Sequence, residues 1–242
     1  MIAIGKEFIE QTKYQNFSNV QDPLKEPPLE AHYDNTKSRY SLPKPEKLEF
    51  DNISLKEAIG KRRSVRKYSE VPLTMGELSY LLWSTQGVKK VVQDKVTFRN
   101  VPSAGARHAL ETYLLINNVE ELPAGLYRYL AIEHMLVEVN FDPKISQAIS
   151  EACLGQDFIK KSGATFIWVA VAPRMTWRYG ERGYRYLFLD AGHVCQNLYL
   201  SAEGLGCGAC AIAAYSDDEL NSLLALDGKE QFVIYIGTVG KK

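Results

Sequence analysis

The chain has 242 residues, enough for one large domain or two small ones with a sizeable buried core. Lysine and arginine together number 29, and so do aspartate and glutamate, so the formal charge is zero and no overall field favours nucleic acid or an anionic membrane. The longest purely apolar run, 166–172, is too short to cross a bilayer, and the first residues lack the apolar core of a signal peptide. A cytoplasmic protein is therefore expected.

The first 53 residues are predicted to form an arm, and residues 54–242 a single domain. Residues 1–18 contain a short helical pattern, and residues 20–50 are rich in proline with little hydrophobic periodicity. We expect such a segment to wrap a surface, which could belong to a partner subunit, rather than to fold as a second domain.

A basic stretch follows a short predicted helix. Ser54 and Glu57 have the spacing of a capping box, so a helix is expected over 55–61. The stretch 60–69, at the end of this helix, reads GKRRSVRKYS and carries five cations. Arginine presents a planar fork of donors that suits phosphate and carbonyl groups, so the stretch could hold a phosphorylated, ring-bearing cofactor. A solvated basic turn is the alternative interpretation.

The segment 74–116 is predicted to contain a helix, two loops and a strand. Thr74 and Glu77 form a second capping box, and the helix that they open carries three leucines on one face and ends near Gly87. Residues 89–99 are polar and are interpreted as a loop. A turn rich in proline, serine and glycine at 100–108 leads into a strand at 111–116. This turn could bind a ring edge or an anion, or it could be an ordinary loop.

The second half of the chain mixes strands and helices. We expect a hairpin of 125–129 and 135–139, a helix from Pro143, a central apolar strand at 165–171, a helix at 183–203, a strand at 209–213, a helix at 217–224 and a strand at 231–239. The helix 183–203 has apolar residues around most of its circumference, so it should be buried on nearly all sides, in the core or at a subunit interface. Gly204 is expected to cap it.

Cysteine and histidine show no metal-ligand spacing. Cys207 and Cys210 form a C-x-x-C pair, but no second ligand pair has comparable spacing, so buried thiols are favoured and no metal site is predicted. Asp190 and His193, three residues apart on a predicted helix, could be a structural pair or a functional one.

Common phosphate-binding and nucleophile motifs are absent as well. The chain has no P-loop, no G-x-G-x-x-G opening a helix and no G-x-S-x-G elbow. A phosphate would therefore have to be held by side chains, and any chemistry would come from a bound cofactor.

Four motifs, in order along the chain, resemble the FMN-dependent nitroreductase superfamily. They are RRSVR at 62–66, PSAGARH at 102–108, the group RY, DAGH and QNL within 185–198, and GLGCGACAI at 204–212. The motifs P-S-x-G-A-R-H, GLY at 125–127 and DAGH are most similar to the SagB-type dehydrogenase branch. The resemblance covers the chain from about residue 54 to its end.

This resemblance implies an α+β fold, with a mixed sheet flanked by helices and a long buried helix. It also implies an intertwined homodimer with two FMN sites at its interface, each with ligands from both subunits. Carried over position by position, it implies contacts to FMN from Arg62, Arg63, Ser64 and Arg66, and a flavin border from the other subunit made of Pro102, Ser103, Ala104 and Ala106. It also implies backbone contacts along the ring from Ala211, Ile212 and Ala213. Lys241 would be a phosphate-binding cation.

Two departures from the family pattern narrow the expected chemistry. Azoline-oxidising relatives use a Lys-Tyr pair ahead of the long helix, where this chain has Arg178 and Tyr179. Arginine does not release its proton and cannot replace lysine as a general base, so oxidation of peptide azolines is less favoured. Arg178 and Tyr179 remain the candidates for catalytic roles on the substrate side. Ala213 and Ala214 replace a Glu or Gly pair, so the carboxylate contact of many nitroreductases is not expected.

The expected function is electron transfer from NAD(P)H, or from an organic donor, through FMN to a small acceptor such as a nitroaromatic or a quinone. One alternative is a SagB-type dehydrogenase that acts on a modified peptide. Another is a protein that binds a flavin or corrin without turnover. A purely structural partner in a biosynthetic complex is the third, and the basic stretch argues against it.

Overall fold

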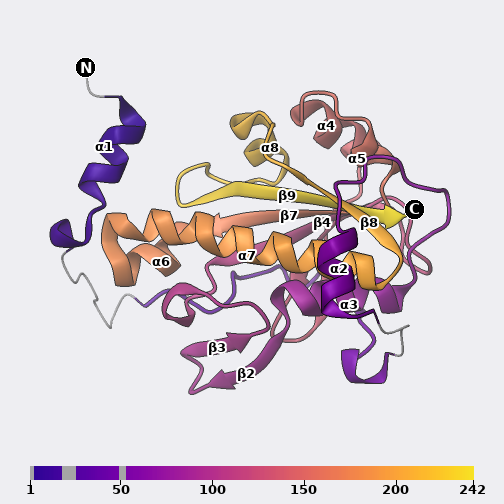
Figure 1. Cartoon of the computed structure of the whole chain (residues 1–242), viewed down its shortest axis with the longest axis horizontal. Coiled ribbons are helices and arrows are strands. Elements are labelled where there is room, and N and C mark those ends of the chain that lie inside the picture. The colour runs from indigo at the N-terminus through magenta and orange to yellow at the C-terminus, as the bar shows by residue number, and fades with distance from the viewer. Residues whose placement is uncertain (1–2, 18–25, 49–52) are drawn as a thin grey trace.

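The computed structural model describes residues 3–17, 26–48 and 53–242, and these form an α+β fold in layers (Figure 1). Seven strands make one sheet in the order β1-β6-β5-β4-β7-β9-β8, and every neighbouring pair is antiparallel. The α+β class predicted from the sequence is confirmed. Among the described residues, parallel pairing is limited to the isolated bridges Ser64–Ala209 and Leu73–Val119.

The strands are β1 (Arg39–Ser41), β2 (Val88–Val92), β3 (Val96–Arg99), β4 (Leu110–Ile116), β5 (Gly125–Leu130), β6 (Met135–Asn140), β7 (Ala164–Val171), β8 (Cys207–Ile212) and β9 (Gln231–Lys241). The α-helices are α1 (Ile4–Gln11), α2 (Leu55–Lys61), α3 (Met75–Gln86), α4 (Ile145–Ala152), α5 (Phe158–Lys161), α6 (Ala172–Tyr179), α7 (Gly183–Gly204) and α8 (Asp217–Leu223). In Figure 1, α2, α3 and α7 lie on one side of the large sheet, and α4 and α8 lie on the other.

Local capping interactions begin two of the helices at the predicted residues. The Ser54 hydroxyl accepts a hydrogen bond from the Glu57 N–H at 3.2 Å, which starts α2. Thr74 and Glu77 form a complete capping box at the start of α3, with bonds of 3.1 and 2.9 Å. Both predicted helices are therefore confirmed, and the first of them ends where the basic stretch begins.

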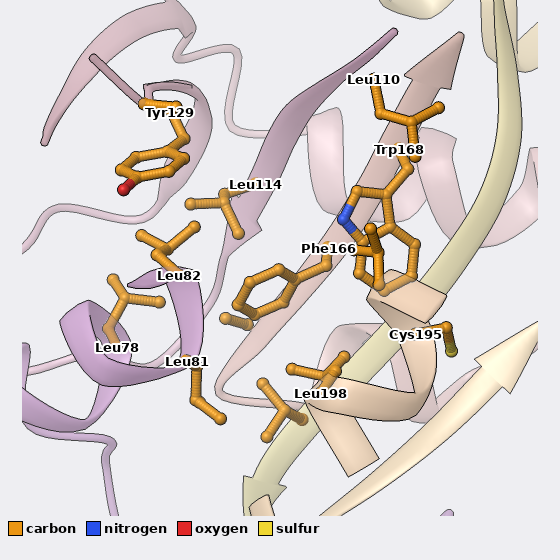
Figure 2. Close-up of a cluster of buried hydrophobic side chains, with 14 of the residues drawn as sticks. Leu78, Leu81, Leu82, Leu110, Leu114, Tyr129, Phe166, Trp168, Cys195 and Leu198 are labelled. Carbon is orange, nitrogen blue, oxygen red and sulfur yellow. The ribbon is translucent and has the colours of Figure 1, made fainter. Parts of the chain in front are cut away.

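The hydrophobic core is divided by the sheet because successive side chains of a strand face opposite sides. On the α3 and α7 side, Leu114 and Phe166 pack with the α3 leucines and with Leu198 of α7 (Figure 2). On the other side, Leu115 and Ile167 pack with residues of α4 and α8. Strand β7 pairs with β4 and β9 and is buried over nearly its whole length, as its apolar sequence predicts.

The long helix α7 differs from its predicted environment. Its sheet-facing side is buried, but Phe188 and Leu189 are 57% and 60% exposed. Gly192, His193 and Gln196 extend this exposed face along the helix. In the single chain the helix is therefore buried on its sheet-facing side only, and of the two predicted environments the core accounts for that side alone. The predicted cap also shifts by one residue, since Gly204 is the last helical residue and Leu205 caps the helix.

Residues predicted to form a polar loop at 89–99 form a hairpin instead. Strands β2 and β3 pair antiparallel as a small separate sheet, connected by a tight turn at Gln93 and Asp94. Both residues have φ of 52°, the positive value found at the central positions of a type I′ turn, here within the three-residue connection 93–95. Strand β8 begins at Cys207, two residues before the predicted strand, so both cysteines of the C-x-x-C pair lie within it, and both are buried free thiols as predicted.

The described part of the proline-rich arm packs on its own chain. Strand β1 pairs with β6 at the edge of the large sheet. Buried Arg128 donates to the carbonyls of Ala31 and His32 at 2.7 and 3.0 Å, and buried Arg174 donates to the carbonyl of Pro28 at 2.8 Å. The parts of the predicted arm at 1–2, 18–25 and 49–52 lie outside the described residues.

Candidate functional site

The basic stretch lies along the edge of the large sheet, beside β8. The Val65 N–H donates to the Ala209 carbonyl at 2.9 Å, and Ser64 forms a parallel bridge with Ala209. Gly208 permits this approach, because a Cβ at that position would lie 2.6 Å from the Cβ of Val65. The predicted cofactor-binding residues of this stretch are therefore held in an extended, fixed conformation rather than in a loose turn.

Tyr199 of α7 connects the basic stretch to β8. Its hydroxyl lies 2.9 Å from the Ser64 hydroxyl and accepts a 2.7 Å hydrogen bond from the Ala211 N–H. The guanidinium of Arg62 lies over the Tyr199 ring, 5.2 Å from its centroid. The fold thus gathers Arg62, Ser64 and Ala211, which are predicted site residues, around one side chain. Sequence reasoning missed Tyr199, since a tyrosine in a long apolar helix carries no distinguishing signal.

The positive charges of this group are uncompensated within the described parts of the chain. Arg63, Ser64 and Arg66 are exposed, and Arg62 is partly exposed. In residues 3–17, 26–48 and 53–242, none of these three arginines forms an ion pair with a carboxylate. Uncompensated arginine forks beside a serine hydroxyl are a donor set that fits a phosphorylated cofactor such as FMN.

Lys241, the other predicted phosphate ligand, lies close to the basic stretch but has a partner of its own. Its carbonyl accepts a hydrogen bond from the Ser69 N–H at 2.9 Å. Its Nζ forms an ion pair with Glu77, which is buried in the first turn of α3. The charge of Lys241 is therefore balanced by Glu77 in this chain, unlike the charges of the three arginines.

The second predicted group, in the loop 102–106, is held by Asp190 of α7. The Ser103 hydroxyl donates to Asp190 at 2.5 Å, and the Ala104 N–H donates to its other oxygen at 3.4 Å. Burial raises the pKa of the Asp190 carboxyl, and these two hydrogen bonds oppose that rise. The hydrogen-bond partners of Asp190 belong to this loop, and exposed His193 adds a smaller electrostatic effect that also lowers the pKa of Asp190.

Arg178 and Tyr179 pack against the same loop. A Cβ at Gly105 would lie 2.5 Å from the Tyr179 hydroxyl and 3.2 Å from Cδ of Arg178. The Tyr179 ring also contacts the Tyr186 ring edge-on, with a centroid separation of 4.8 Å. The fold therefore brings the two candidate substrate-side residues together with the predicted flavin border, Pro102, Ser103, Ala104 and Ala106.

The two groups meet α7 at different places. Asp190, which holds the loop, precedes Tyr199, which holds the basic stretch, by nine residues; at 1.5 Å per residue this places them about 14 Å apart along the helix. Within one chain, the two halves of the predicted flavin site are thus attached to different parts of α7. Of the remaining predicted residues, Ala211 adjoins Tyr199, Ile212 has its side chain in the core on the α4 and α8 side, and Ala213 is exposed.

The α+β fold, the cation-rich sheet edge and the long helix α7 are the features expected of the nitroreductase fold. The model of the Nitroreductase family matches residues 59–241, and the chain belongs to that family. It is 36% identical over 194 residues to MJ1384, a nitroreductase homologue of Methanocaldococcus jannaschii; the alignment covers 80% of this chain and 94% of that protein.

Two further comparisons bear on fold and branch. Trifolitoxin-processing protein TfxB of Rhizobium leguminosarum bv. trifolii is 27% identical over 226 residues, 89% of this chain, and the chain spans 60% of the length of TfxB. The structure of a nitroreductase homologue from Ralstonia eutropha JMP134 has a TM-score of 0.70, 24% identity, and coverage of 93% of this chain and 97% of that one. The latter supports the fold.

Two other properties concern only the described residues. No helix among them is long and apolar enough to cross a membrane. Nor does that part of the chain bring together three or more His, Cys, Asp or Glu side chains that could hold a metal ion.

Proposed function

We propose that the protein is a homodimeric, FMN-dependent oxidoreductase that takes electrons from NAD(P)H and passes them to a small acceptor such as a nitroaromatic or a quinone. The observation that carries the proposal is the uncompensated cluster of Arg62, Arg63 and Arg66, fixed against β8 beside the Ser64 hydroxyl. Family membership and the motif order described above support FMN as the anion that these residues bind.

The homodimer is supported by two features of α7. The groups held by Tyr199 and by Asp190 are attached to α7 about 14 Å apart along the helix, so they form two separate parts of the predicted site within one chain. Phe188 and Leu189 leave an apolar patch exposed on the same helix. A second copy packed on this face would cover the patch and would supply its loop 102–106 to the first chain's arginines.

When bound, FMN would supply hydride and electron transfer, and the protein's own residues would bind and orient it. The arginines would hold the phosphate and stabilise negative charge on the ring. Ser103 would be fixed by Asp190 at the flavin border, and Tyr179 would offer a hydroxyl donor on the substrate side. Arg178 would bind acidic or carbonyl groups without acting as a base.

A dehydrogenase of a modified peptide is the second candidate, favoured by one observation: the likeness to a protein whose name assigns it to trifolitoxin processing. The Arg178 and Tyr179 pair does not favour it, because neither Arg178 nor a neighbouring lysine supplies a base there. The proposal also includes a cytoplasmic location, which the four unpaired cysteines support.

The visible absorption spectrum of the purified protein, before and after anaerobic addition of NADH or NADPH, tests the proposed function. We expect flavin bands that bleach with a nicotinamide donor and recover when a quinone is added. Flavin bands that persist would favour a binding protein without turnover or a different donor. A protein that binds no FMN would exclude the proposal.

A further inference from the structure

Tyr199 contacts three predicted cofactor residues from two separate segments of the chain. Its hydroxyl lies 2.9 Å from the Ser64 hydroxyl, and its ring lies under the Arg62 guanidinium. On its other side, the same oxygen accepts the Ala211 N–H at 2.7 Å. The backbone position predicted to lie along the flavin ring is therefore tied to the hydroxyl predicted to contact the cofactor.

The direction of the hydrogen bonds in this chain follows from counting donors. Because the Tyr199 oxygen accepts the Ala211 N–H, its own hydrogen remains to be donated, and the Ser64 oxygen is the neighbour at hydrogen-bond distance. The reverse arrangement, with Ser64 donating to Tyr199, would leave the phenol hydrogen without an acceptor in the chain, at an exposed contact where only solvent could take it. The favoured order is therefore Ala211 to Tyr199 to Ser64.

This order leaves the hydrogen of Ser64 available for a further acceptor. In the chain alone, its neighbour is the thiol of Cys210, and sulfur is a weak acceptor. Ser64 is exposed and stands between Arg62, Arg63 and Arg66, so an anionic oxygen drawn to the arginines would reach it. A hydroxyl that already accepts a hydrogen bond is also a stronger donor, because hydrogen bonds in a chain polarise one another.

We propose that Tyr199 is a positioning residue for cofactor binding, which orients Ser64 as a hydrogen-bond donor to an oxygen of FMN and holds the Ala211 backbone beside the ring. The inference rests on the proposed function. Tyr199 itself does not contact the cofactor; it acts through Ser64 and Ala211. If Tyr199 only joined α7 to the sheet edge, its loss would lower the stability of the fold. Its effect on FMN affinity would then be independent of whether Ser64 is present.

The test measures FMN dissociation constants by quenching of flavin fluorescence for the wild type, Tyr199→Phe, Ser64→Ala and the double variant. We expect each single change to weaken FMN binding by about tenfold to a hundredfold, the range for a lost hydrogen bond to a charged acceptor. The double variant should bind FMN about as tightly as whichever single variant binds it less tightly, because both changes break the same chain of hydrogen bonds. Ser64→Thr, which keeps the hydroxyl, should retain most of the affinity.

Tyr215→Phe is the matched control, since it removes a tyrosine hydroxyl that bonds to the Val233 carbonyl on the far side of the sheet. It should leave FMN affinity unchanged.

If Tyr199→Phe binds FMN as the wild type does, or if the effects of the two single changes multiply, the inference is wrong while the proposed function stands. If Tyr199→Phe does not fold, wild-type affinity in the exposed variant Ser64→Ala would overturn the inference by itself. A wild type that binds no FMN would overturn both.

Discussion

The hydroxyl of Tyr179 lies only 2.5 Å from the point at which a Cβ on Gly105 would stand. Gly105 also has a φ of 58°, a backbone conformation that residues with a side chain rarely adopt. The loop at the predicted flavin border and the candidate substrate-side tyrosine therefore fit together only because residue 105 lacks a side chain.

Gly105→Ala should destabilise the protein by about 2 kcal/mol, because it combines the backbone cost of a positive φ with displacement of Tyr179. Urea denaturation measures this change. Gly155→Ala is the matched control, since Gly155 has a φ of 71° but nothing within 4 Å of an added Cβ. We expect the control to show the backbone cost alone. Equal losses in the two variants would show that Tyr179 does not constrain the loop.

Arg62→Ala together with Arg66→Ala should remove the flavin. Each charge-assisted contact to a phosphate contributes about 1.5–3 kcal/mol, so loss of two should weaken FMN binding by at least a hundredfold. The ratio of flavin to protein absorbance after purification measures the result. Lys144→Ala with Lys229→Ala makes the same change in charge at exposed positions away from the basic stretch and should retain flavin. A double arginine variant as yellow as the wild type would place the cofactor elsewhere.

Leu189→Glu should give a monomer that has lost FMN. The side chain is 60% exposed on α7, and a charge there would be buried without a partner if two copies pack through this helix. Light scattering coupled to size-exclusion chromatography reports the mass. Leu154→Glu, at a leucine that is 68% exposed on another surface, should stay dimeric. A Leu189→Glu variant that remains a flavin-bound dimer would move the interface to another face.

Stability should depend on pH through His108, next to the loop 102–106. Burial, with the nearby charge of Arg99, lowers the pKa of His108 to about 3, from its ordinary value of 6.5. The unfolded chain then binds a proton that the folded chain excludes, so stability is fully present above pH 6.5 and is lost as the pH falls toward 3.

The slope from one such group is at most about 1.4 kcal/mol per pH unit. We expect His108→Asn, which removes the titrating group and tolerates the positive φ at this position, to lose less stability than the wild type between pH 6.5 and 4.5. Urea denaturation across that range measures the two slopes. Parallel curves for the two proteins would show that His108 is not held neutral by the fold.

The elements that the sequence predicts well depend on interactions between near neighbours. The N-cap bond at Ser54 and the capping box at Thr74 act over three residues, and the apolar run in β7 marks a strand covered on both faces. The β2–β3 hairpin escaped prediction because its burial does not follow polarity: in β3, Thr97 and Arg99 are buried while Phe98 is exposed. The sequence could not show that one apolar face of α7 is exposed, because the apolar residues of a helix do not reveal which other elements pack against them.

By itself, the sequence determined the family, the α+β class, most helix and strand positions, and the basic stretch and loop as candidate site segments. Only the tertiary structure decided how the site residues are held: Ser64 by Tyr199, Ser103 by Asp190, and Lys241 by Glu77, pairs separated by 135, 87 and 164 residues. The physical reason is range. Capping and periodicity act within a few residues, whereas a hydrogen bond or ion pair between distant residues exists only after the sheet and α7 have brought them together.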